Sequence, residues 1–150
     1  METIYFPAPE RYRDYLDLLL LADPDMAMLD LYLDRCRMMV LEEDGDPVCE
    51  VCLLELPDGV VELKNVATRP DREGRGYASR LIHEALAGCR DRVHTAIVGT
   101  SPDGVGFYRR LGFEPYRTEP GFFLQYRPLI YENGRLLEDM IYLRRPIKED

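Results

Sequence analysis

The sequence predicts one α/β (α+β) domain over residues 1–150, with helices flanking a mixed, mostly antiparallel sheet. The chain has 150 residues, 46% of them hydrophobic, which is enough for one buried core and too few for two independent domains. Segments with strand-like alternation and segments with helical periodicity follow one another in the order β-α-α-β-β-β-α-β-α-β-β. No internal repeat, low-complexity run or linker interrupts this order.

The first part of the chain predicts a strand and two helices. The strand covers residues 3–6 and ends at prolines, and a helix follows over about 10–22. Three leucines form the predicted buried face of that helix: Leu16, Leu19 and Leu20. Asp23 followed by Pro24 is typical of a helix N-terminus, so a second helix is predicted from there to Leu33.

Three strands separated by short Asp-Gly turns come next. They are predicted over residues 38–42, 48–56 and 60–68, with turns at 43–46 and 57–59. Because the connections are this short, neighbouring strands are expected to pair antiparallel.

The second half predicts two helices among further strands. One helix follows Pro70 and ends near Gly88, and a strand is predicted over 93–98. A short helix over 102–111 ends at Gly112. The last strands are predicted over two segments, with an irregular aromatic stretch between them: 114–118 and 136–144.

The charge balance limits the possible partners. The chain has 28 acidic and 19 basic side chains and a formal net charge of −9, which repels phosphate backbones and anionic membranes. We therefore expect neither a nucleic acid nor a membrane as partner. The sequence has no apolar stretch of membrane-spanning length and no targeting pattern, so a cytoplasmic location is expected.

Four cysteines include the pair Cys49 and Cys52, spaced as in zinc and redox motifs. The pair falls in a strand-like run, where residues three apart point to opposite faces. No second Cys or His pair stands at ligand spacing. The sequence therefore predicts reduced, core-facing thiols and no metal site.

A glycine-rich turn after the strand over 60–68 is the first chemical signal. It contains Gly74 and Gly76 and leads into an amphipathic helix, whose first N–H groups can hold a pyrophosphate. A dinucleotide fingerprint would need glycine at Ser79, and the P-loop lysine is absent. Taken alone, the turn is also compatible with a simple chain reversal.

A second segment stands about thirty residues downstream and ends in Gly112 and Phe113. Together, the two segments resemble the GNAT superfamily of CoA-dependent acyltransferases. The turn matches the (Gln/Arg)-x-x-Gly-x-(Gly/Ala) loop of that family at Gly76 and Ala78, with Glu73 in place of Gln or Arg. The helix matches its Phe-Tyr-x-x-x-Gly-Phe pattern at four residues: Phe107, Tyr108, Gly112 and Phe113.

This resemblance implies a sheet that splays between its fourth and fifth strands and acetyl-CoA as co-substrate. The Val66 N–H would stabilise the oxyanion that develops on the thioester carbonyl. The cofactor-binding residues that the resemblance implies are Val66, Ala67, Thr68, Glu73, Gly74, Arg75, Gly76, Tyr77, Ala78 and Ser101. For Ser101, a helix N-cap is an equal alternative.

The same resemblance implies two catalytic residues. Glu62 matches a position that supplies a general base in many members, and Tyr108 would protonate the leaving thiolate. The alternatives are a solvent-facing Glu62 paired with Lys64, and a Tyr108 that only packs in the core.

The predicted function is therefore transfer of an acetyl group from acetyl-CoA to a small-molecule or peptide amine by direct attack. A catalytically silent CoA-binding module is the alternative, and a homodimer is possible. Acidic residues are expected to surround the site and to favour a cationic amine: Glu50, Glu55, Glu62 and Asp139. The aromatic loop over 122–131 is predicted either to border the acceptor pocket or to close the core or a subunit interface.

Overall fold

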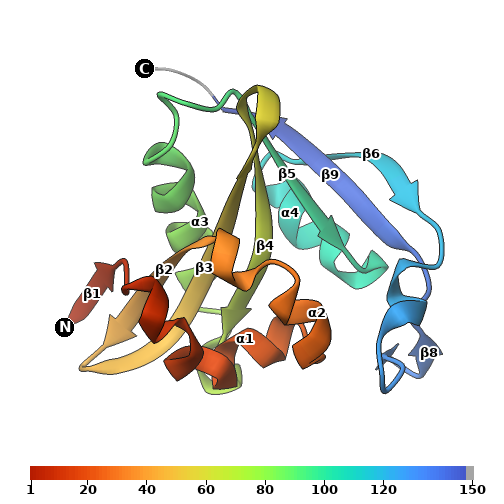
Figure 1. The fold of residues 1–150 in the computed structure, drawn as a ribbon, viewed down its shortest axis with the longest axis horizontal. Coiled ribbons are helices and arrows are strands. Elements are labelled where there is room, and N and C mark those ends of the chain that lie inside the picture. Colours follow the sequence, from red (N-terminus) through yellow and green to blue (C-terminus); the bar gives the residue numbers. More distant parts are fainter. Residues whose placement is uncertain (148–150) are drawn as a thin grey trace.

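The computed structural model describes residues 1–147, which are built around a seven-stranded sheet (Figure 1). The last three residues of the predicted domain lie outside the described residues. The strand order is β1-β2-β3-β4-β5-β9-β6, and every neighbouring pair is antiparallel except β4 and β5, which are parallel. The strands are β1 Glu2–Tyr5, β2 Arg37–Glu43, β3 Asp46–Leu56, β4 Val60–Thr68, β5 Thr95–Thr100, β6 Glu114–Glu119 and β9 Met140–Pro146. The predicted mixed, mostly antiparallel sheet is confirmed.

Helices cover both faces of the sheet (Figure 1). On one face, α1 packs on β3 and β4, and on the other face α3 packs on β2, β3 and β4. The α-helices are α1 Leu16–Ala22, α2 Met26–Asp30, α3 Tyr77–Ala87 and α4 Val105–Arg110. The 3-10 helices are η1 Pro9–Tyr15, η2 Leu33–Arg35, η3 Pro57–Gly59, η4 Pro70–Arg72, η5 Pro102–Gly104 and η6 Phe122–Gln125. Within residues 1–147, no helix is long and apolar enough to cross a membrane.

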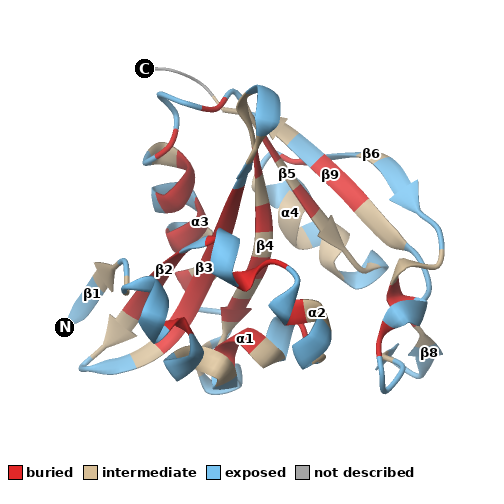
Figure 2. Cartoon of the chain, in the orientation of Figure 1, coloured by how far each residue is buried: buried red, intermediate tan, exposed pale blue. Residues whose placement is uncertain are grey.

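Two buried clusters lie on opposite faces of the sheet (Figure 2). On β3, Cys49 and Val51 belong to the cluster under α3, whereas Cys52 and Leu54 belong to the cluster under α1. The prediction that Cys49 and Cys52 point to opposite faces is therefore confirmed. All four cysteines are free and buried.

The sheet opens between β4 and β5. These strands pair at four positions, from Val60 with Thr95 to Leu63 with Val98, and then diverge (Figure 1). At the same point, Cys52 and Leu53 of β3 face Asn65 and Leu63 of β4, so Lys64 is an extra, bulged residue. A bulge increases local twist and bends its strand, which accounts for the divergence beyond residue 63. The predicted splay between the fourth and fifth strands is confirmed.

Several predicted boundaries in the first part of the chain were wrong. The predicted helix over 10–22 begins as the 3-10 helix η1, and only its second half is α-helical. Leu18 and Leu19 are fully buried there, whereas Leu16 and Leu20 are partly exposed. The second helix is capped by Asp25 rather than Asp23, because the Asp25 carboxylate accepts the N–H groups of Ala27 and Met28.

The C-terminal part differs more. The strand predicted over 93–98 begins two residues later, and residues 136–144 do not form one strand. Instead, β7 Tyr131–Glu132 and β8 Arg135–Leu136 form a separate hairpin, and β9 begins at Met140. Asn133 and Gly134 have φ of 52° and 77°, the left-handed conformation that a two-residue hairpin turn requires.

Candidate functional site

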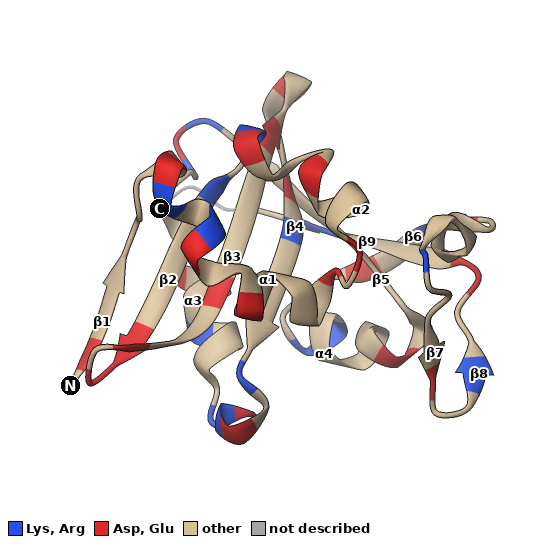
Figure 3. Cartoon of the chain, turned by 60° about the horizontal axis from the view of Figure 1, so that its bottom comes forward, with Lys and Arg blue, Asp and Glu red and all other residues tan. Residues whose placement is uncertain are grey.

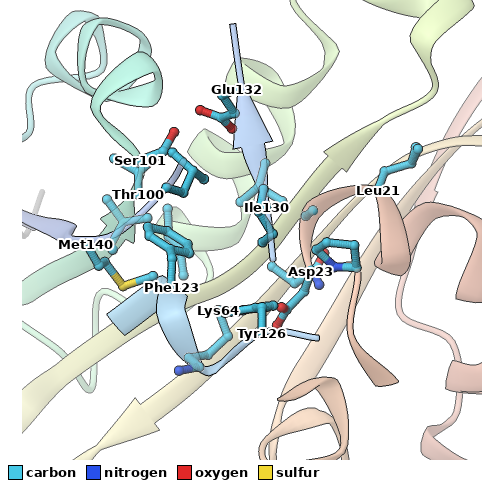
Figure 4. A pocket seen from close by; sticks show the side chains of 18 of the residues that line it. Leu21, Asp23, Lys64, Thr100, Ser101, Phe123, Tyr126, Ile130, Glu132 and Met140 are labelled. Atoms are coloured by element: carbon cyan, nitrogen blue, oxygen red, sulfur yellow. The ribbon is translucent and has the colours of Figure 1, made fainter. Parts of the chain in front are cut away.

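A cavity of about 310 Å³ lies in the opening between β4 and β5 (Figure 4). Its walls come from the diverging parts of both strands, from the end of α1 and from the segment between β6 and β9. Three residues that the sequence predicted for the site line this cavity together: Val66, Ser101 and Tyr108. Ser101 occupies the N-cap position of η5, as the alternative predicted, but its side chain makes no capping hydrogen bond.

A second cavity, of about 190 Å³, adjoins the first. The two cavities share several wall residues, among them Asp23, Lys64 and Tyr126. Glu62 lines only the second cavity, so the two predicted catalytic residues lie in neighbouring compartments.

Tyr108 points its ring into the packed region beside the first cavity. The ring makes edge-on contacts with Phe107 and Phe113, with centroids 5.0 and 5.8 Å away. Its hydroxyl has no hydrogen-bond partner among residues 1–147. Burial, with a smaller contribution from Glu50, raises the pKa of Tyr108, so the hydroxyl keeps its proton and can act as a donor.

Glu62 is mostly buried and forms an ion pair with Lys64. The side chain is 13% exposed, and its Oε2 lies 3.5 Å from the Lys64 Nζ. The Lys64 ammonium also lies over the Tyr32 ring, 4.9 Å from its centroid. The predicted alternative pairing is therefore present, but it occurs in the wall of a cavity and not on the open surface.

The glycine-rich turn has the conformation that an anion site needs. Gly74 and Gly76 have φ of 78° and 80°, and Gly76 is the N-cap of the eleven-residue helix α3. Among the described residues, the N–H groups of Gly74 and Gly76 make no backbone hydrogen bond. These groups and the first turn of α3 provide free donors at the positive end of a helix dipole.

The side chains of this turn have mixed charge (Figure 3). Arg72 donates to Glu43 over 2.8 Å and also pairs with Asp71, so its charge is already engaged. Glu73 and Arg75 are exposed. The other residues predicted to bind the cofactor, 67–68 and 73–78, lie outside both cavities, along the continuation of β4 and at the start of α3.

The prediction that four acidic residues surround the site was wrong for three of them. Glu50 is fully buried in the core, where the Cys52 thiol donates to its Oε1 over 3.3 Å. Burial raises the pKa of Glu50 well above its usual value. Glu55 pairs with Arg92, and Asp139 lies in the wall of another cavity. Only Glu62 of the four faces the two cavities described above.

Sequence analysis missed two polar residues that line the first cavity, Asp23 and Asn65. Both are buried, with 7% and 3% of their surface exposed. The signal for Asn65 was available, because it occupies a core-facing position of an alternating strand, where a polar side chain needs an explanation. Asp23 carried no such signal, since an aspartate before proline predicts a cap.

Comparisons with known proteins agree with this geometry. A family model described as acetyltransferase (GNAT) domain matches residues 34–115. The chain is 28% identical over 149 residues to an uncharacterized N-acetyltransferase, YvbK of Bacillus subtilis (strain 168), covering 95% of this chain and 96% of that protein. Its structure is similar to an IAA acetyltransferase from Bacillus cereus ATCC 14579, with 26% identity, a TM-score of 0.90 and coverage of 97% and 99%. It is also similar to a GNAT family acetyltransferase from Elizabethkingia anophelis with acetyl-CoA bound, with 25% identity, a TM-score of 0.85 and coverage of 97% of each chain.

Proposed function

We propose, since the chain belongs to the GNAT acetyltransferase family and is therefore an acyltransferase, that it moves the acetyl group of acetyl-CoA to a primary amine. The observation that carries this proposal is the cavity between β4 and β5, lined by Val66 and Tyr108. Beyond this cavity, β4 leads to a turn with free N–H donors. The similar Elizabethkingia anophelis protein, which has acetyl-CoA bound, supports the same co-substrate here.

Acetyl-CoA would bind along β4, with its pyrophosphate at the turn. The N–H groups around Gly74 and Gly76 would donate to the phosphate oxygens. The proposed contacts are those that the sequence predicted: Val66, Ala67, Thr68, Glu73, Gly74, Arg75, Gly76, Tyr77, Ala78 and Ser101. Because Arg72 is already paired with Glu43, Arg75 is the exposed cation that can offset the charge of Glu73.

The reaction would be a direct attack without a covalent enzyme intermediate. Glu62, or a water that it orders, accepts a proton from the ammonium, and the neutral nitrogen attacks the thioester carbonyl. The N–C bond forms while the Val66 N–H stabilises the oxyanion. The C–S bond then breaks, Tyr108 gives its proton to the sulfur of CoA, and the nitrogen gives its second proton to water. Release of the Glu62 proton to solvent and reprotonation of Tyr108 from solvent complete the cycle.

Calorimetry with acetyl-CoA, NAD and ATP tests the binding step. We expect heat only with acetyl-CoA, because the turn lacks the features specific to the other two nucleotides. A response to NAD in the absence of one to acetyl-CoA would contradict the proposal.

Release of free thiol from acetyl-CoA, measured with a panel of primary amines, tests the chemistry. Amine-dependent release supports the transferase reaction. Binding of acetyl-CoA without release for any amine class would favour the catalytically silent module, for which the carboxylate of Glu73 in the turn is the main argument.

A further inference from the structure

A hydrogen-bonded chain of buried groups runs from α1 to β4. The Tyr32 hydroxyl donates to Asp23 Oδ2 over 2.6 Å and accepts from Asn65 Nδ2 over 3.2 Å. The second N–H of the Asn65 amide donates to the Leu19 carbonyl over 3.1 Å. Asp23 is therefore held by a tyrosine that is itself held by an asparagine.

The chain of donors fixes the orientation of the Asn65 amide. The Leu19 carbonyl can only accept, so the group that faces it must be the amide nitrogen. The Tyr32 hydroxyl has one proton, which it gives to Asp23, and therefore also needs a donor from Asn65. Turning the amide over would set its oxygen against the Leu19 carbonyl, which leaves Oδ1 as the free end of Asn65.

Two acceptor atoms of this network have no donor. Asp23 Oδ1 and Asn65 Oδ1 are buried, and neither has a partner at hydrogen-bond geometry within the described part of the chain. Burial raises the pKa of Asp23, whereas the nearby hydroxyls of Tyr126 and Tyr32 and the charge of Lys64 oppose that rise and favour the carboxylate. Both residues line the first cavity. Leaving a buried acceptor unpaired is unfavourable, so the pair is suited to a ligand that brings several donors.

We propose that Asp23 and Asn65 bind the ammonium group of the acceptor, which rests on the proposed function. An ammonium has three N–H donors and a positive charge. Two of the donors match the two unpaired oxygens, and the positive charge matches the carboxylate of Asp23, to which one of these oxygens belongs. A hydroxyl has a single donor and no charge, so an alcohol of the same shape satisfies the subsite poorly.

The position of Asp23 also indicates the rest of the acceptor. Figure 4 shows Asp23, Lys64 and Tyr126 together at one end of the first cavity, and the same three residues line the second cavity. The second cavity contains Glu62, and its wall combines apolar and aromatic side chains with charged ones: Met28, Leu31, Phe122 and Tyr142 beside Arg35 and Lys64. An ammonium at Asp23 would place its substituent there, which selects primary alkyl- and arylalkyl-amines.

Calorimetry tests the inference without relying on turnover. The ligands are butylamine, hexylamine and 2-phenylethylamine, with 2-phenylethanol as the neutral comparison. We expect the best amine to bind wild type at least tenfold more tightly than the alcohol. Asp23→Asn should weaken amine binding by about 10-fold or more, because it removes the charge and turns a donor toward the ammonium. Asp17→Asn, which removes an exposed carboxylate from the same helix, should leave the affinity unchanged.

A structure of wild type with the best-binding amine gives a reading that does not depend on variant stability. A nitrogen within hydrogen-bond distance of Asp23 Oδ1 and Asn65 Oδ1 supports the subsite. Waters on both oxygens with the amine bound elsewhere, equal effects of Asp23→Asn and Asp17→Asn, or no binding by any of the amines would each overturn it. Acetyl-CoA binding, measured on the same protein, separates the two proposals. If wild type does not bind acetyl-CoA, the proposed function is contradicted. If it binds acetyl-CoA but gives one of the contradicting results with the amines, only the ammonium subsite is contradicted.

Discussion

At the scale of single residues, Tyr108 combines a fixed ring with a free hydroxyl. Its ring is held by Phe107 and Phe113, and its backbone carbonyl accepts the Phe113 N–H over 3.1 Å at the end of α4. A hydroxyl that is positioned in this way and kept protonated by burial is suited to protonate a leaving thiolate.

We expect Tyr108→Phe to lower kcat by about 10- to 1,000-fold while the Kd for acetyl-CoA stays nearly constant. The ring contacts remain in this variant, so only the proton donor is lost. Turnover is to be measured under conditions in which the chemical step limits the rate, with Tyr131→Phe as a control that removes an exposed hydroxyl. An unchanged kcat would assign Tyr108 to packing.

Glu50 shows the cost of a carboxyl group in the core. Its folded-state pKa is raised well above the usual 4.5, so the folded chain still holds a proton after the unfolded chain has lost it. The stabilisation of the neutral form is therefore complete below about pH 4.5 and is lost as the pH rises through the folded pKa, by up to about 1.4 kcal/mol per pH unit.

Glu50→Gln should therefore gain stability relative to wild type as the pH increases. We expect the difference in free energy of unfolding between the variant and wild type to favour the variant more at pH 8 than at pH 5, measured by urea titration. Glu10→Gln, which changes an exposed carboxylate, should follow the wild-type profile. Parallel profiles for Glu50→Gln and wild type would contradict the burial argument.

At the scale of elements, the start of α2 shows why local sequence does not decide every boundary. Asp23 and Asp25 are both good capping residues, and only tertiary contacts choose between them. The Tyr32 hydroxyl binds Asp23 inside the molecule, whereas Asp25 accepts the N–H groups of Ala27 and Arg127. The N–H donors, with Arg127 foremost, lower the pKa of Asp25.

The parts of the site that lie within the two motif-bearing segments were predictable. The segments over 62–78 and 106–113 carried the resemblance to the GNAT superfamily, and the resemblance implied both the splay and a common site for Val66 and Tyr108. The structure shows the splay and places both residues at one cavity. The subsite at Asp23 was not predictable, because it joins the end of α1 to β4 through contacts over 30 residues apart in sequence. Two-residue strands such as β7 and β8 are also too short to show alternation, although Asn133 and Gly134 gave a turn signal.

The turn before α3 can be tested with a matched pair of glycines. Gly76 and Gly45 have φ of 80° and 83°, and a Cβ added at either position would meet nothing within 4 Å. Replacement by alanine should therefore cause similar strain in both, about 1–2 kcal/mol. Only Gly76→Ala should raise the Kd for acetyl-CoA, by roughly tenfold or about 1.4 kcal/mol, because its Cβ enters the space proposed for the pyrophosphate.

The free energy of unfolding and the Kd, measured for both variants, separate strain from ligand contact. A similar loss of stability with a selective loss of binding in Gly76→Ala is the expected outcome. Equal Kd values for the two variants would exclude the turn from the CoA site.

At the scale of the whole molecule, the net charge of −9 acts differently on the two proposed substrates. A cationic amine is attracted and the polyanionic acetyl-CoA is repelled. The turn before α3, where charges of both signs alternate, does not form a basic patch that would reverse this effect (Figure 3).

Raising the salt concentration should therefore change the two substrates in opposite directions. Between about 0.01 and 0.15 M ionic strength, the screening length falls from about 30 to about 8 Å. We expect kcat/KM for the amine to fall and the Kd for acetyl-CoA to decrease, with kcat unchanged at saturation of both substrates. If both affinities weaken together, local charges in the site outweigh the field of the molecule.

The divergence of β4 and β5 after four paired positions gives the sheet two interior edges in addition to its outer ones. Exposed sheet edges invite association with other chains, but these edges lie in the wall of the first cavity. The pantetheine arm of acetyl-CoA is narrow and carries amide groups, which would bridge the two edges much as a short strand does. The co-substrate would then act as a missing strand, so that amide protons of residues 64–68 should exchange with solvent more slowly when acetyl-CoA is bound.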